Sequence, residues 1–433
     1  MSLRTSILLS TALRPVGMFI SIIYTPLLLS YLGQEQYGIW VTILSVINWI
    51  NYFDVGIGNG YRNKLTDALE NNDDGSVAAL TRTAYMLLAG VVGIVFVVGM
   101  ILVLSLDVNA FFNTDLSIKA VLGVSLAFVC INFVAALCKP QLFALQHAEL
   151  VSLMAVSVNG LTLLFIASLN ACLPRSMLLV AISVGMAGLI TNIVFSAISW
   201  KSHKGLRPSR GPLDRANVMS ICFLGVIFFL VQISALILYT TDNLIIMGCL
   251  GAASVTAYST TYNAFGAVGS LATAALSPMW SKVTQTAANG DFSWIMKALK
   301  KSLLAMVPFA LVFGVLAFAF KPIAKIWLGT ELNYVPGLIP CMAIYYTLFL
   351  IGSVLSSIAN GLGRTKVQLI TGLAGAVINI PLSVFLCLVV KLDATGVLLA
   401  TILTMAVSNV AVCVDLAMFL KTKMHGASAE VGA

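Results

Sequence analysis

The chain has 433 residues, of which 60% are hydrophobic and only 9% are charged, and its formal net charge is +8. A soluble domain carries about 25% charged residues, so this composition excludes a water-soluble enzyme and an intrinsically disordered chain. The excess apolar surface must face lipid, and the sequence therefore predicts an all-α integral membrane protein. The basic excess indicates membrane topology and lipid headgroups rather than nucleic acid.

Twelve stretches of about 20 mostly apolar residues follow one another along the chain, and each is long enough to cross a membrane as a helix. Their length without strand-period alternation favours helices over a β-barrel. The predicted spans are residues 8–32, 37–58, 84–106, 119–138, 150–171, 176–199, 218–241, 254–279, 302–320, 336–358, 367–390 and 395–419.

The basic residues predict the orientation of these spans. When the N-terminus is placed in the cytoplasm and the spans alternate, most of the 24 lysines and arginines lie on the cytoplasmic side. Because such an excess marks the inside, we expect an even number of spans and two cytoplasmic termini.

The second half of the chain aligns with the first at a shift of 218 residues, which places Gly33 on Gly251 and Asp73 on Asp291. The alignment predicts two pseudo-symmetric six-helix bundles of the same orientation with a cavity between them. A basic segment joins them, which indicates contact with anionic lipid. The predicted domains are an N-terminal bundle, a cytoplasmic linker and a C-terminal bundle, at residues 1–200, 201–217 and 218–433.

Motifs along the whole chain carry a family resemblance. The most specific is Phe53-Asp-Val-Gly-Ile-Gly-Asn-Gly-Tyr-Arg-Asn-Lys-Leu65, and Tyr31-Leu-Gly-Gln-Glu-Gln-Tyr-Gly-Ile-Trp40 is a second. Weaker motifs lie at residues 241–246, 326–329 and 360–364. The chain resembles Wzx-type flippases of O-antigen and related polysaccharide units, in the superfamily shared with MATE drug exporters and lipid II flippases.

The resemblance implies a MATE-like fold in a bacterial inner membrane. It further implies that an undecaprenyl-pyrophosphate-linked oligosaccharide moves from the cytoplasmic to the periplasmic leaflet by alternating access, beside other polysaccharide assembly proteins. A MATE-type exporter of small molecules is the alternative, since it shares the fold. The sequence shows no P-loop and no catalytic constellation, so we expect a transporter rather than an enzyme, with H⁺ or Na⁺ as the coupling ion and no cofactor.

Cations near the cytoplasmic side are candidate ligands for a pyrophosphate. Arg14 lies within the first span, where a planar guanidinium could bind phosphate oxygens or pair with Asp54. Arg62 and Lys64 follow the second span and could receive the headgroup, or only contribute to the positive-inside bias.

A polar stripe is predicted on the second span, because Asn48, Asn51 and Asp54 recur every three residues. Such a stripe lines either a wet cavity or a hydrogen-bonded seam between helices. On the cavity interpretation, Asn51 is a candidate substrate ligand and Asp54 a candidate ion-coupling acid.

Two further acids and two tyrosines complete the candidate residues. Asp242 could bind the coupling ion or could be a solvated acid at a helix end, and Asp415 could bind an ion or pair with Lys421. Tyr258 and Tyr262 offer aromatic faces on which sugars could stack, although aromatic residues are also common at membrane interfaces.

Overall fold

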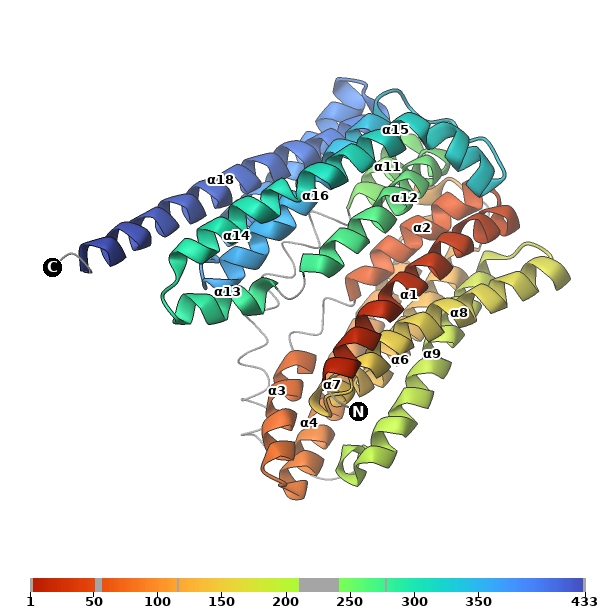
Figure 1. Ribbon diagram of the computed structural model, residues 1–433. Helices are drawn as coiled ribbons and strands as arrows, with labels where there is room; N and C mark the ends of the chain where they lie inside the picture. Colours follow the sequence, from red (N-terminus) through yellow and green to blue (C-terminus); the bar gives the residue numbers. More distant parts are fainter. Residues whose placement is uncertain (1–2, 51–56, 115–116, 210–240, 277–278, 431–433) are drawn as a thin grey trace. The chain divides into compact units, whose positions relative to one another are not determined.

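A computed structural model describes residues 3–50, 57–114, 117–209, 241–276 and 279–430. Every regular element in these ranges is a helix (Figure 1). The chain divides into two compact units, unit 1 at Met1–Leu236 and unit 2 at Ile237–Ala433. The bundle boundaries at residues 200 and 218 stay predictions.

Unit 1 contains nine described α-helices and one short 3₁₀ turn. They are α1 (Leu3–Leu32), α2 (Gln34–Asn48), α3 (Ile57–Glu70), α4 (Asp74–Ser105), α5 (Val108–Phe112), α6 (Ile118–Ala135), α7 (Cys138–Ala144), α8 (Ala148–Cys172), α9 (Met177–Ser202) and η2 (Lys204–Leu206). Within this unit α1 packs along α8, α6 packs along α9, and α4 lies between α3 and α6.

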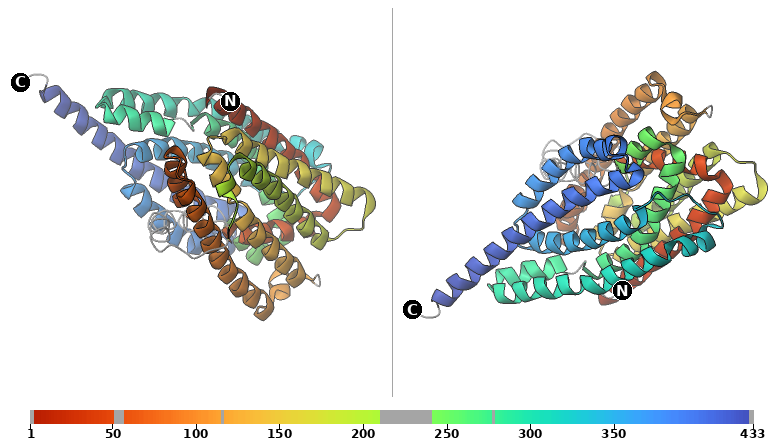
Figure 2. Two further views of the ribbon diagram at one scale, coloured as in Figure 1. Left: turned by 90° about the horizontal axis from the view of Figure 1, so that it is seen from below. Right: turned by 90° about the horizontal axis from the view of Figure 1, so that it is seen from above.

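Unit 2 contains eight described α-helices and one π-helical segment. They are α11 (Asp242–Leu250), α12 (Ala252–Leu276), α13 (Met279–Ala288), α14 (Phe292–Leu304), α15 (Met306–Leu328), α16 (Leu338–Gly361), α17 (Lys366–Val384), η3 (Phe385–Val389) and α18 (Asp393–Glu430). Helix α18 packs against α16 and α17 and then runs on toward the C-terminus beyond them (Figure 2).

The described helices have the character of membrane spans. Eight helical segments are long and apolar enough to cross a bilayer. Large apolar side chains on them point outward, as on α15, where Phe318 is 94% and Ile326 is 85% exposed. Exposing so much apolar surface to water would cost free energy. These side chains therefore face lipid, and the chain is a multi-pass membrane protein.

Most of the predicted spans coincide with helices of the structure. One predicted span, 218–241, lies almost wholly outside the described residues. Another, 37–58, is not one continuous described helix, because α2 ends at Asn48 and the shorter α3 begins at Ile57.

The internal repeat is visible in the backbone. Gly33 and Gly251, which the 218-residue shift aligns, have φ of 80° and 83°, and each stands just before a helix. Asn72 and its equivalent Gly290 also have positive φ, at 53° and 76°. Glycine and asparagine tolerate this left-handed region best, so the repeat preserves the same turns with the residue types that can form them.

Two equivalent aspartates cap equivalent helices. The carboxylate of Asp73 accepts a hydrogen bond from the backbone N–H of Ser76 at 2.9 Å, and Asp291 accepts one from Trp294 at 2.9 Å. Each aspartate satisfies an N–H that a helix start leaves free. The repeat read from the sequence therefore extends to helix starts.

Candidate functional site

A cavity of about 500 Å³ lies inside unit 1. Its wall is built from side chains of α2, α3, α4, α6, α7, α8 and α9. Four aromatic rings are part of this wall, from Trp40, Phe128, Phe133 and Phe143. This size and mixed lining are typical of a small-molecule or headgroup site.

One end of the cavity is cationic. Arg62 of α3 and Lys139 of α7 both line it, and no Asp or Glu among the described residues does. The guanidinium carbon of Arg62 lies 4.5 Å from the ring centroid of Phe143, which orients the cation without neutralising it. The arrangement therefore favours an anionic group at this end of the cavity.

The wall formed by α6 and α9 offers amides and a hydroxyl. Asn192 donates to the side-chain oxygen of Asn132 at 2.9 Å, and Asn132 donates to the carbonyl of Gly185 at 2.9 Å. A Cβ at Gly185 would lie 2.2 Å from the ring of Phe128, so only glycine allows this close packing. Ser125 Oγ is buried here without a hydrogen-bond partner among the described residues, and a bound cargo could supply one.

A buried polar network fixes the helices that carry the two cations. Gln141 of α7 donates to Tyr61 of α3 at 3.2 Å and to the carbonyl of Leu206 at 3.0 Å. Its own amide oxygen accepts from Ser199 at 2.6 Å, and the Tyr61 hydroxyl also bonds Thr81 at 2.8 Å. Since Gln141 is fully buried, all of these bonds are shielded from water.

We expect Gln141→Leu to destabilise unit 1. The change leaves the carbonyl of Leu206 and the hydroxyl of Ser199 without this partner, at about 1–3 kcal/mol for each buried group left unsatisfied. Thermal unfolding in detergent measures the effect as a lower Tm. Ser168→Ala on α8 removes an exposed hydroxyl and is the matched control. An unchanged Tm for Gln141→Leu would contradict the role given to this network.

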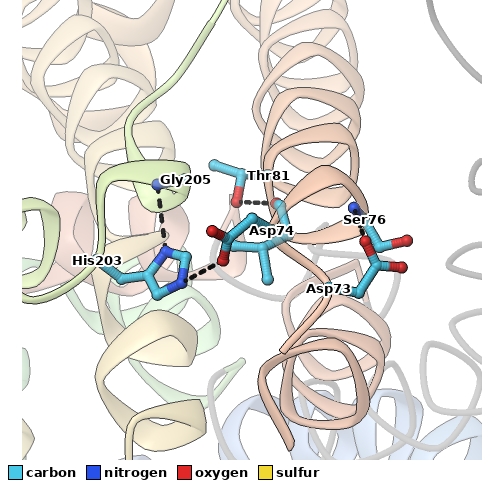
Figure 3. A network of polar contacts seen from close by, with 7 residues as sticks. Asp73, Asp74, Ser76, Thr81, His203 and Gly205 are labelled. Carbon is cyan, nitrogen blue, oxygen red and sulfur yellow. Dashed lines mark hydrogen bonds and ion pairs between the residues drawn. The ribbon is translucent and has the colours of Figure 1, made fainter. Parts of the chain in front are cut away.

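The segment after α9 is fastened to the start of α4 (Figure 3). His203 Nε2 lies 3.1 Å from Asp74 Oδ1, and the backbone N–H of Gly205 donates to His203 Nδ1 at 3.2 Å. This geometry puts the imidazole proton on Nε2. Beside it, hydrogen bonds from Ser76 lower the pKa of the Asp73 carboxyl, which keeps that helix cap ionised. The start of the predicted linker is thus bound to unit 1.

Unit 2 contains a buried carboxylate. Asp242, the first residue of α11, is only 7% exposed, so the interpretation as a solvated helix-end acid is wrong. Tyr258 donates to Asp242 Oδ2 at 2.5 Å and Thr401 donates to Oδ1 at 3.4 Å. Asn379 in turn donates to Thr401 at 3.0 Å. The packing of α11 against α12, α17 and α18 excludes water, which the sequence alone did not indicate.

Further buried oxygens lie on α17, one of the helices that pack against α11. Asn379 Oδ1 and Ser383 Oγ, one turn apart on α17, are buried with no hydrogen-bond partner in the described ranges. No Lys, Arg or His in those ranges forms an ion pair with Asp242. Hard cations prefer carboxylate, amide and hydroxyl oxygens, and a buried uncompensated carboxylate within a membrane protein favours a bound cation or a proton.

Unit 1 has no carboxylate at the equivalent place. The 218-residue shift aligns Asp242 with Tyr24 and Tyr258 with Trp40. Of these two equivalent positions, the acid is therefore found in unit 2 alone. We expect one such cation site per chain, not two.

The other predicted site residues fall in different places. Arg62 lines the cavity of unit 1, whereas Lys64 is exposed on α3 and is not among the lining residues. Arg14 belongs to α1, but its side chain is outside the described part of the structure. Asn51 and Asp54 lie outside the described residues altogether, so the polar stripe stays a prediction.

The two predicted sugar-stacking tyrosines belong to an aromatic cluster. Tyr258 and Tyr262 stack with ring centroids 6.3 Å apart, and Tyr262 also packs against Tyr345 at 5.9 Å and Tyr346 at 5.4 Å. Tyr258 is buried and its hydroxyl bonds Asp242. In this structure Tyr258 therefore serves the carboxylate site and offers no open face to a sugar.

Asp415 has a partner that spacing did not suggest. Its two oxygens accept from Arg364 at 2.6 Å and 3.1 Å, and the guanidinium lies 4.5 Å from the ring centroid of Phe419. The predicted pairing with Lys421 is wrong, because the turn after α16 brings Arg364 against α18. The carboxylate already holds a cation from its own chain.

Several site residues were absent from the sequence candidates. They include Lys139 at the cationic end, Gln141 in the network, and Asn379 and Thr401 beside Asp242. A sequence signal existed for Asn379, a polar residue in an apolar span. For Lys139 the sequence offers no signal beyond the positive-inside bias that it shares with the other cytoplasmic cations.

Comparisons with known proteins agree on the fold. The model of the MatE family matches residues 228–385. A solved inward-facing multidrug resistance MATE family transporter of the MOP superfamily is similar over 98% of this chain and 96% of its own, with 14% identity and a TM-score of 0.71. An outward-facing structure of such a transporter is similar over 98% and 97%, with 12% identity and a TM-score of 0.64.

A third solved structure has a similar fold. It is a MOP superfamily transporter from Pyrococcus furiosus, similar over 98% of this chain and 97% of that one, with 16% identity and a TM-score of 0.61. Its description reports a binding pocket of reverse polarity that suggests a different function. No curated protein matches this chain. The chain has the fold of MATE transporters, and the predicted all-helical, MATE-like class is confirmed.

Proposed function

We propose that the chain is an ion-coupled exporter of the MATE type that works by alternating access. The MATE fold and the family match over residues 228–385 support this class. The observation that carries it is the buried carboxylate of Asp242 among oxygen donors, since an uncompensated acid is costly in a membrane protein unless it serves an ion. We further propose a cytoplasmic membrane location with both termini inside.

The coupling ion, H⁺ or Na⁺, binds at Asp242 in this proposal. An ion there removes the cost of the buried charge and draws on Thr401 and the free oxygens of α17. Binding thereby stabilises one arrangement of α11, α17 and α18 over the other, which is how an ion gradient biases a two-state equilibrium. Asp54 stays a second candidate acid, and the engaged Asp415 a third.

The cargo in this proposal carries negative charge. The cavity of unit 1 offers Arg62 and Lys139, and none of its described lining residues is acidic, so a cationic drug would find no counter-charge. Its amides and aromatic rings suit a polar or sugar-like group beside the anion.

This same cavity favours a second candidate function, the translocation of an undecaprenyl-pyrophosphate-linked oligosaccharide. The two cations suit a pyrophosphate, and the volume of about 500 Å³ suits the headgroup while the polyprenyl tail remains in lipid. Arg14, Asn51 and Lys64 stay proposed ligands for that headgroup. Other polysaccharide assembly proteins are the partners that this function requires.

A deletion strain tests the two candidates against each other. An exporter predicts that the strain becomes more susceptible to anionic toxic compounds, while lipid-linked oligosaccharides stay at their normal level. A flippase predicts that lipid-linked repeat units accumulate on the cytoplasmic leaflet and that surface polysaccharide is lost. Wild-type protein must restore the phenotype, and a strain that shows neither change would contradict both.

A further inference from the structure

The hairpin of α13 and α14 in unit 2 has an exposed basic and aromatic face. Lys297, Lys300 and Lys301 of α14 are all exposed, and none of them has an ion-pair partner in the described part of the chain. Trp280 of α13 is 51% exposed and Trp294 of α14 is 37% exposed. Such a combination of cations and tryptophan is typical of a membrane interface.

The register of α14 places Trp294, Lys297 and Lys301 on one face. Ile295 and Leu299 are buried and bind the helix to its unit. Trp294, Lys297 and Lys301 follow at intervals of three and four residues, so they share the opposite, exposed face. On this exposed face the indole of Trp294 therefore lies in the same stripe as the ammonium groups of Lys297 and Lys301.

The internal repeat shows that this face is specific to unit 2. The equivalent hairpin of unit 1, residues 57–86, has three cations and four acids, whereas residues 275–304 have four cations and one acid. The positions of Trp280 and Trp294 correspond to Arg62 and Ser76. Because the repeat predicts the same orientation for both halves, a positive-inside bias would act on both hairpins alike and does not explain the difference.

We propose that the exposed face of α13 and α14 is a binding site for the headgroup of an anionic phospholipid. Ammonium groups of Lys297, Lys300 and Lys301 neutralise the lipid phosphate, and the indoles of Trp280 and Trp294 lie at headgroup depth beside the acyl chains. A membrane lipid suits this face better than a soluble anion, since the tryptophans need an apolar phase next to the charge.

Lipid nanodiscs of the full-length protein test the proposal without any transport step. The protein is placed in phosphatidylcholine containing a minor fraction of brominated phosphatidylglycerol, or the same fraction of brominated phosphatidylcholine. The chain has six tryptophans, so the contribution of Trp294 is obtained as the difference in fluorescence between wild type and Trp294→Phe. We expect brominated phosphatidylglycerol to quench this signal more strongly.

Lysine variants distinguish a lipid-binding site on α14 from a general attraction between the basic protein and anionic lipid. Replacing Lys297, Lys300 and Lys301 with glutamine should reduce the preference for phosphatidylglycerol about tenfold or more. The matched control replaces Lys119, Lys321 and Lys391, three exposed lysines elsewhere, and should retain the preference. Equal quenching by both lipids in wild type, or an equal loss in the control, would overturn the proposal. Because no cargo or ion gradient is present, neither result bears on the transport function.

Discussion

Asp242→Asn is expected to abolish the dependence of transport on the cation gradient. Asparagine keeps the size of the side chain, and its single amide oxygen can still accept from Tyr258 or Thr401. Its NH2 group cannot accept the other bond, and the side chain lacks the charge that attracts an ion. Flux into proteoliposomes under an imposed Na⁺ or pH gradient measures the effect. We expect the variant to move cargo equally with and without the gradient.

Two further variants test whether the effect is specific to the Asp242 carboxylate. Tyr258→Phe keeps the carboxylate and removes one donor to it, and loss of such a supporting bond weakens affinity for Na⁺ by about tenfold. Glu331→Gln removes an exposed acid on a loop and should leave the gradient dependence intact. If Asp242→Asn kept the wild-type gradient dependence, the coupling site would have to lie elsewhere.

The fold was largely predictable because its determinants are local. A span needs only a long apolar run, so composition and hydropathy indicated nearly all of the described membrane helices. The repeat was equally readable, since Gly33 with Gly251 and Asp73 with Asp291 mark turns and caps that depend on the residue at one position. The end of α2 at Asn48 was not readable, since apolar residues continue after it in the sequence.

The sites were less predictable because they depend on which helices meet. Spacing shows which residues share a helix face but not which neighbour that face contacts. The sequence therefore offered Asp415 only an ion or Lys421 on its own helix, while the fold supplies Arg364 from 51 residues away. For the same reason the sequence left open whether Asp242 binds an ion or is solvated at a helix end, since α17 and α18, two helices that pack against α11, lie far along the chain.

Loss of the two cations that line the cavity of unit 1 is expected to have a large effect on cargo binding. Replacing Arg62 and Lys139 with glutamine should weaken binding of an anionic cargo, because each removed charge-assisted hydrogen bond contributes about 2 kcal/mol. That value corresponds to about 30-fold in Kd for each cation. Equilibrium binding of a radiolabelled pyrophosphate lipid, or of an anionic drug, to the purified protein measures the loss.

The pattern of losses distinguishes a binding role from general electrostatics. Lys119→Gln removes an exposed cation outside the cavity and should change Kd little. Wild-type affinity should fall between low and physiological salt, because Arg62 and Lys139 are exposed and salt screens exposed charges. Retained affinity in the double variant would contradict an anionic cargo in unit 1. A cationic drug that bound the double variant more tightly than wild type would instead show that these two charges exclude such compounds, and would favour anions as the natural cargo.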